Sequence, residues 1–156
     1  MSAKTWAIAA IVLWVLGAGV LVTKFMRGST TAGTDGRTAV LLAASERDAV
    51  LGEMRALLAG VQGIIDGLAR GDMKRVADAA SHVGMSAAVD TNPAILMKLP
   101  LAFKQTGMGV HRTFDDIAAA ATKGESKEQL QTRLAAQLAV CVGCHETYQL
   151  KDEATK

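Results

Sequence analysis

The sequence predicts an all-α protein in which an antiparallel four-helix bundle is preceded by an N-terminal transmembrane helix. Three observations support this fold class. Aromatic residues make up 4% of the chain, prolines number two, and alanine, leucine and methionine are frequent, a composition that favours helix over strand. A long apolar run lies near the N-terminus. Downstream, apolar residues recur at steps of three and four, as in amphipathic helices.

The first element is the apolar run from Trp6 to Val22, which contains no polar side chain. Its length meets the requirement of about 17–25 residues for a membrane-spanning helix. We therefore predict a retained signal anchor over residues 1–26. The alternative is a cleaved secretory signal, but the small residues 17–19 are followed by more apolar chain, which disfavours clean cleavage. The flanking charges leave the orientation undecided.

Residues 27–37, RGSTTAGTDGR, are rich in glycine, serine and threonine and predict a flexible linker. We expect the remaining part of the chain, residues 38–156, to form the helical domain. Gly71 ends the first amphipathic stripe, Asp72 is suited to cap the next helix, and Ser126 with Gln129 forms a capping box. The expected helices cover about 38–69, 72–88, 101–122 and 126–149.

The charges argue against a nucleic-acid partner. The formal net charge is +2, and basic and acidic residues are interspersed instead of forming a basic stripe. The sequence also shows no recognisable catalytic nucleophile with a general base, and no phosphate-binding glycine loop. We therefore expect an electron carrier and not an enzyme.

The chemistry is concentrated in Cys141-Val142-Gly143-Cys144-His145. This C-x-x-C-H pattern is the attachment motif of c-type haem. Two thiols at this spacing form thioether bonds to the two vinyl groups of the porphyrin, which holds the adjacent histidine at the iron. The motif therefore predicts one haem c, with Cys141 and Cys144 as attachment residues and His145 as the proximal iron ligand.

Two other interpretations of the cysteine pair remain open. A redox-active dithiol is typical of a βαβ context, and no strand is expected here. A structural zinc site needs four ligands, whereas the motif supplies three, so that His82 or His111 would have to complete it.

A C-x-x-C-H motif on the last helix of a four-helix pattern resembles the cytochrome c′ family, the class II c-type cytochromes. The resemblance covers about residues 38–150, and its specific part is CVGCHETY. It implies that the first bundle helix covers the distal face of the haem. Met54, on the inward stripe of that helix, is then the candidate distal iron ligand, and its other reading is an ordinary core methionine. Family members often carry an arginine one turn before the distal residue, where this chain has Val50.

The function we expect is one-electron transfer between redox proteins. These partners should lie in the periplasm or the membrane, because covalent haem attachment takes place outside the bacterial cytoplasmic membrane. We expect a periplasmic domain that is anchored to the bacterial cytoplasmic membrane, and the alternative is a soluble periplasmic protein after signal cleavage. If Met54 does not bind the iron, the five-coordinate haem would instead bind a diatomic gas such as NO or CO. The resemblance also allows a homodimer, since cytochromes c′ are commonly dimers.

Overall fold

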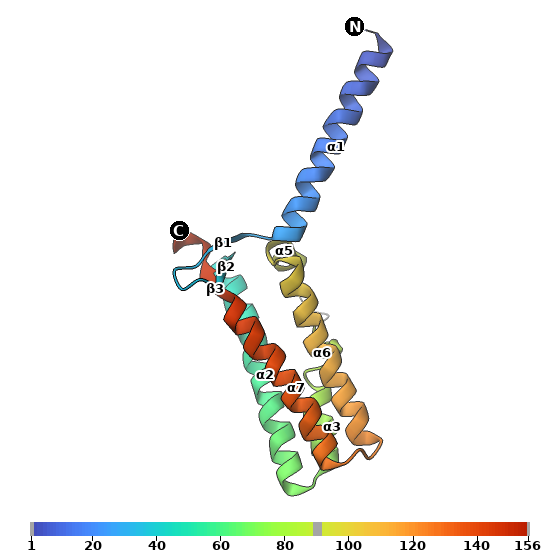
Figure 1. Cartoon of the computed structure of the whole chain (residues 1–156), viewed down its shortest axis with the longest axis vertical. Coiled ribbons are helices and arrows are strands. Elements are labelled where there is room, and N and C mark those ends of the chain that lie inside the picture. The colour runs from blue at the N-terminus through green and yellow to red at the C-terminus, as the bar shows by residue number, and fades with distance from the viewer. Residues whose placement is uncertain (1, 89–91, 156) are drawn as a thin grey trace.

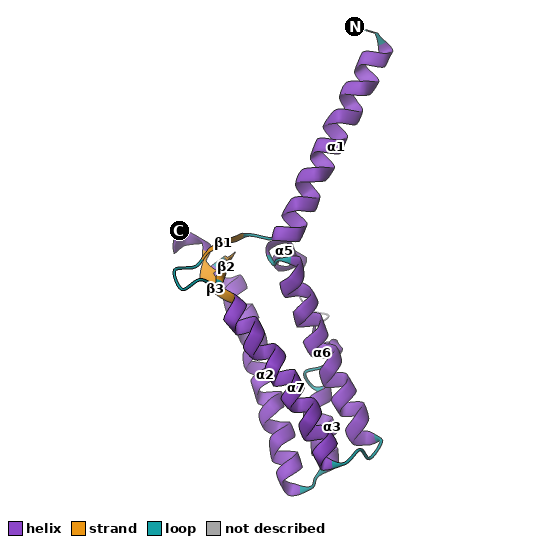
Figure 2. Ribbon diagram, viewed as in Figure 1, coloured by secondary structure: helices purple, strands orange, loops and turns teal. Residues whose placement is uncertain are grey.

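The computed structural model describes residues 2–88 and 92–155, and most of this chain is α-helical (Figures 1 and 2). A long N-terminal helix projects from a bundle of helices, and a small sheet lies at the end of the bundle nearest to that helix. The elements are α1 (Ala3–Arg27), β1 (Thr30–Ala32), β2 (Thr38–Leu42), α2 (Ala44–Arg70), α3 (Met73–Ser81), α4 (Met85–Ala88), α5 (Pro93–Lys98), α6 (Leu101–Thr122), α7 (Lys127–Thr147), β3 (Tyr148–Asp152) and a short 3₁₀ turn, η1 (Glu153–Thr155).

The helix ends follow the local signals in the sequence. Asp72 caps α3 by accepting a hydrogen bond from the Arg75 amide, and Gly71 ends α2 with a left-handed backbone, φ 70°. The predicted capping box of Ser126 and Gln129 is confirmed at the start of α7. The expected helix over 101–122 is α6.

The main core is shared by α2, α3, α6 and α7. Its fully buried members include Ile64 of α2, Val76 of α3, Ile117 of α6 and Leu130 of α7. Burying one side chain of this size contributes about 1.5–3 kcal/mol. A single apolar core therefore joins the four elements that the amphipathic pattern identified, although α3 is much shorter than the expected helix over 72–88.

The sheet is a correction to the all-α prediction. β2 pairs antiparallel with β1 and parallel with β3, the strand that directly follows α7. The expected first helix therefore begins at Ala44 and not at residue 38, and the expected last helix ends at Thr147. The physical reason is that Val40 and Leu42 are fully buried against a second apolar cluster, and the partner strand that satisfies their backbone is remote in sequence.

The linker prediction also differs from the structure. Residues 27–37 include β1, and their backbone is hydrogen-bonded to the domain: the Ser29 amide donates to the Lys98 carbonyl at 2.7 Å, and the Leu41 amide donates to the Ser29 carbonyl at 2.8 Å. Gly33 closes the following turn through the Arg37 carbonyl. The small residues of this expected flexible linker instead form a strand and a turn.

Helix α1 is long and apolar enough to cross a membrane by length and composition, and none of it is buried inside the protein. A membrane anchor and a signal sequence both meet this description.

Candidate functional site

The C-x-x-C-H motif lies on the last turns of α7, next to an opening between α7 and α2. Cys141, Cys144 and His145 are spaced by three and four residues, so they share one face of the helix. Both cysteines are free and half-buried. The burial of the two thiols raises the pKa of each, because a thiolate is disfavoured away from water.

Two cavities meet at this face. The smaller, of about 360 Å³, is lined by Cys144 and His145 and reaches the sheet at Tyr148 and Leu150. The larger, of about 670 Å³, is lined by Cys141 and His145 and extends along α2 and α7. His145, Leu51 and Met54 line both cavities. The three motif residues therefore border two neighbouring cavities, which share His145, Leu51 and Met54 in their walls.

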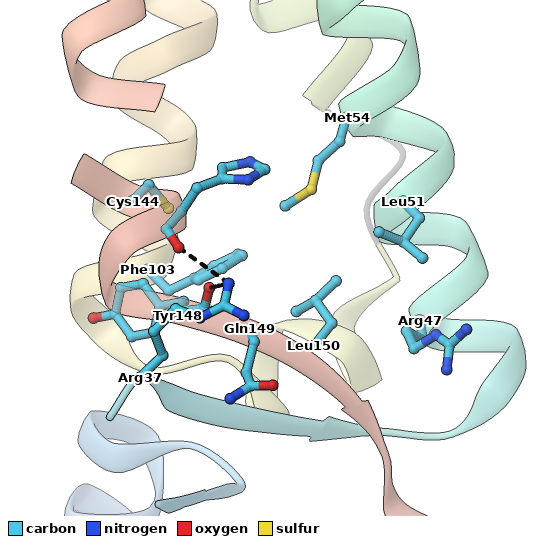
Figure 3. A pocket seen from close by; sticks show the side chains of 10 residues that line it. Arg37, Arg47, Leu51, Met54, Phe103, Cys144, Tyr148, Gln149 and Leu150 are labelled. Carbon is cyan, nitrogen blue, oxygen red and sulfur yellow. Dashed lines mark hydrogen bonds between the residues drawn. The ribbon is translucent and has the colours of Figure 1, made fainter. Parts of the chain in front are cut away.

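Met54 lies across this space from the motif. Figure 3 shows its thioether extending from α2 toward the cavity, with Cys144 on the α7 side. The side chain is half-buried and packs against the apolar cluster that also contains Val50 and Phe103. The structure thus places Met54, Cys141, Cys144 and His145 around the same pair of cavities, while haem attachment and iron ligation stay predictions.

His111, in the domain interior, and His145, at the cavities, differ in their hydrogen bonding. His111 is 3% exposed, and both ring nitrogens are engaged: Nδ1 lies 2.8 Å from the Val83 carbonyl and Nε2 lies 2.7 Å from Glu53 Oε1. The hydrogen bond to Glu53 raises the pKa of His111. The His145 ring is exposed and makes no side-chain hydrogen bond within residues 2–88 and 92–155. His145 is therefore free to bind a metal, and His111 is not.

Arginines surround the smaller cavity. Arg47 lines it, and its Nε is buried with no hydrogen-bond partner in the described part of the chain. Together Arg47 and Arg37 place positive charge on the wall of this cavity, which favours an anionic group inside it. Arg55 instead lines the larger cavity and is exposed. The carboxylates of a porphyrin are acceptors of the required kind, which fits the expected cofactor.

Arg37 is a site residue that the sequence did not reveal. Its Nη1 donates to the carbonyls of His145, at 3.2 Å, and Tyr148, at 3.4 Å, so it caps the end of α7 beside the motif. Asp35 holds the guanidinium through Nε at 2.8 Å, and the same contact lowers the pKa of Asp35. Arg37 lies in the segment predicted to be a linker, and only the sheet brings it to α7. On the wall of the smaller cavity, the rings of Tyr148 and Phe103 pack edge to face, with their centroids 5.3 Å apart.

The remaining candidate residues lie elsewhere. His82 is exposed and lines a groove between α2 and α3. Within the described residues, no three side chains of histidine, cysteine, aspartate or glutamate are grouped so as to hold a metal ion. The fourth ligand that a zinc site would need from His82 or His111 is therefore not supplied by this arrangement.

Comparisons of the chain with protein-family models, with curated proteins and with solved structures find no match. The functional argument consequently rests on the motif and on the site geometry.

Proposed function

We propose that the protein is a c-type cytochrome of the cytochrome c′ type, with one haem c held between α2 and α7 of a four-helix bundle and used for one-electron transfer. The observation that carries the proposal is the position of Cys141, Cys144 and His145 on the walls of two neighbouring cavities, both of which Met54 borders from the opposite helix. A C-x-x-C-H motif on a surface without a cavity would not support it.

Each residue then has a role that follows from its position. Cys141 and Cys144 form the thioether bonds, and His145 binds the iron through its free imidazole. Bound in this way, the haem supplies reversible one-electron chemistry at its iron. Leu51 and Leu57 exclude water from the cavity, and Arg47 donates to a propionate. Exclusion of water and the choice of axial ligand are the means by which the chain sets the reduction potential.

Met54 decides between electron transfer and gas binding. As a sixth ligand it would saturate the iron, leave little change of geometry on reduction, and raise the reduction potential. Without that bond, the apolar wall of the larger cavity, which includes Val61 and Phe114, would leave room for a small uncharged gas. The half-buried Met54, which borders both cavities, favours the first function.

The experiment is a comparison of Met54→Ala with Met97→Ala in the haem-loaded protein. Met97 lies on α5 and is 48% exposed, outside both cavities. We expect a low-spin spectrum that does not change with CO in the parent protein and in Met97→Ala. Met54→Ala should become high-spin, bind CO and have a lower reduction potential. A parent protein that already binds CO would assign the gas-binding function, and identical spectra in all three proteins would remove Met54 as a ligand.

We further propose that the domain lies in the periplasm, because covalent haem attachment takes place there, and that α1 anchors it to the cytoplasmic membrane. Its partners are then redox proteins of the periplasm or of the membrane itself.

A further inference from the structure

The end of α1 is joined to the domain by a close backbone contact. Gly28 has φ 65°, and a Cβ built there would lie 2.4 Å from the Lys98 carbonyl oxygen and 2.6 Å from the Leu99 carbonyl carbon. The next residue, Ser29, donates its amide to the same Lys98 carbonyl at 2.7 Å. Only glycine fits this position, both for its positive φ and for its lack of a side chain. The junction is therefore a specific contact between α1 and α5.

A second contact joins α1 to α6. The Lys104 ammonium lies 3.7 Å above the Phe25 ring and donates to the Phe25 carbonyl at 3.1 Å, which satisfies one of the free carbonyls at the end of α1. Lys104 and Gly28 hold the helix from two sides. A cleaved signal sequence would have no need of such contacts, so they favour a retained α1.

The depth of this junction in a membrane follows from the length of the apolar run. The apolar run of residues 6–22 is long enough to cross the hydrocarbon core, which needs about 17–25 residues, so the core ends near Val22. The cations of the last turn, Lys24 and Arg27, come at that level, where long basic side chains extend toward lipid headgroups. The residues that touch Phe25 and Gly28 are then at the headgroup level too.

Helix α5 presents two different faces at this level. Ile95, with Leu99 just beyond the helix, is buried in the apolar cluster next to the smaller cavity. Met97 faces outward and is 48% exposed. Figure 1 shows α1 leaving the bundle beside α5, while the turn between α6 and α7 lies at the opposite end. An apolar side chain held beside a membrane span is suited to the bilayer interface.

We propose that α5 rests in the headgroup region of the bilayer that α1 spans, with Met97 against lipid, so that the domain is seated on the membrane. The Gly28 and Lys104 contacts fix the domain to the end of α1. They keep the end of the bundle that carries the sheet and the smaller cavity toward the bilayer. A cofactor in that cavity would keep one distance from the membrane surface. The proposal requires a retained α1, and it does not depend on the bound haem.

The test is photo-crosslinking of the full chain in vesicles of phosphatidylcholine and phosphatidylglycerol. A p-benzoyl-phenylalanine replaces Met97 in one protein and Lys123 in another. Lys123 is exposed at the end of α6, remote from α1. We expect phospholipid adducts by mass spectrometry from position 97 and none from position 123. Equal adducts at the two positions, or none at position 97, would overturn the proposal, as would a mature chain that lacks α1.

Two glycine variants test whether the junction at Gly28 is needed for the lipid contact of position 97. Gly28→Ala introduces the clash with Lys98, whereas Gly36→Ala changes a glycine of similar φ, 85°, with nothing within 4 Å of its Cβ. We expect the adduct from position 97 to be lost in Gly28→Ala and retained in Gly36→Ala. Circular dichroism verifies that both variants are folded. If Gly28→Ala does not fold, Lys104→Gln replaces it, with a reduced adduct expected. An undiminished adduct in the folded junction variant would show that lipid contact does not need the docked helix, contrary to the proposal.

Discussion

The two sides of α2 are built differently. Toward α3, three glycines of α2 allow close contact: a Cβ added to Gly60, Gly63 or Gly67 would lie 2.6–2.8 Å from atoms of α3 or of Val83 just beyond it. Toward α7, the side chains are large and the helices stand apart, leaving cavities of about 360, 390 and 670 Å³ with Leu58 and Ile65 exposed beside them. One helix thus has a closed side and an open side.

The difference indicates how the site is held open. A cavity between two helices persists only if each helix is supported elsewhere, because apolar surfaces otherwise close on each other. On α2 this support comes from the contact with α3 and from the His111 bond to Glu53, the residue before Met54. On the α7 side, β3 and Arg37 hold the end of the helix that carries the motif. Each of these supports can be tested by mutation.

The largest difference in stability is expected between substitutions of two neighbouring isoleucines of α2, one in the main core and one on the α7 side. Ile64 is fully buried in the main core, and Ile65 is 51% exposed on the α7 side. Ile64→Ala should lower the free energy of unfolding by about 2–5 kcal/mol, through lost burial and the cavity left behind. Ile65→Ala should lower it by less than about 1 kcal/mol. Urea unfolding measures both, and similar losses would show that the two sides of α2 are not different.

Two glycines of α2 with different surroundings should give changes in stability of opposite sign. Gly67→Ala places a Cβ 2.9 Å from the Val76 backbone nitrogen, and such overpacking costs about 1–3 kcal/mol. Gly52, on the same helix, has only the end of the Arg55 side chain nearby, at 3.7 Å. Gly52→Ala should therefore stabilise the helix by about 0.5–1 kcal/mol. Thermal unfolding of the two variants decides the matter, since a stabilised Gly67→Ala would refute close packing at α3.

A smaller loss of stability, about 1 kcal/mol, is expected for His111→Gln, and it should depend on pH. The hydrogen bond to Glu53 raises the folded pKa of His111 above its ordinary value of 6.5. A group with a raised folded pKa adds stability that is complete below the unfolded pKa and is lost as the pH rises through the folded one. The loss caused by His111→Gln should therefore be greatest below pH 6.5 and shrink at higher pH.

Unfolding titrations at several pH values measure this dependence. His82→Gln, which replaces an exposed ring, is the matched control for removal of an imidazole. A loss that stays constant with pH would mean that the Glu53 bond does not stabilise the protonated ring.

Much of the helical pattern could be predicted from the sequence because its signals are local. Capping residues such as Asp72 and Ser126 act within a few positions of the helix they begin. The strands could not be predicted, because β2 and β3 pair across the whole domain, as between Thr38 and Tyr148, and the apolar residues 39–42 fit a helix equally well by composition.

Some residues of the candidate site could likewise be predicted from local sequence patterns, and others could not. The C-x-x-C-H spacing marks three of its residues, and the amphipathic stripe placed Met54 on the inward face of its helix. Arg37 and the bond between Glu53 and His111 depend on contacts between remote segments. Only the structure shows that Arg47 lines the smaller cavity and Arg55 the larger one.

The central claim is that the open side of α2 faces a haem bonded to Cys141 and Cys144. Its most direct test is the mass of the denatured chain after expression in a bacterial host with cytochrome c maturation, together with the optical spectrum. We expect one haem to remain attached under denaturing conditions, and to be lost as a covalent adduct in the double variant Cys141→Ser, Cys144→Ser. A colourless protein with the mass of the bare polypeptide would contradict the account.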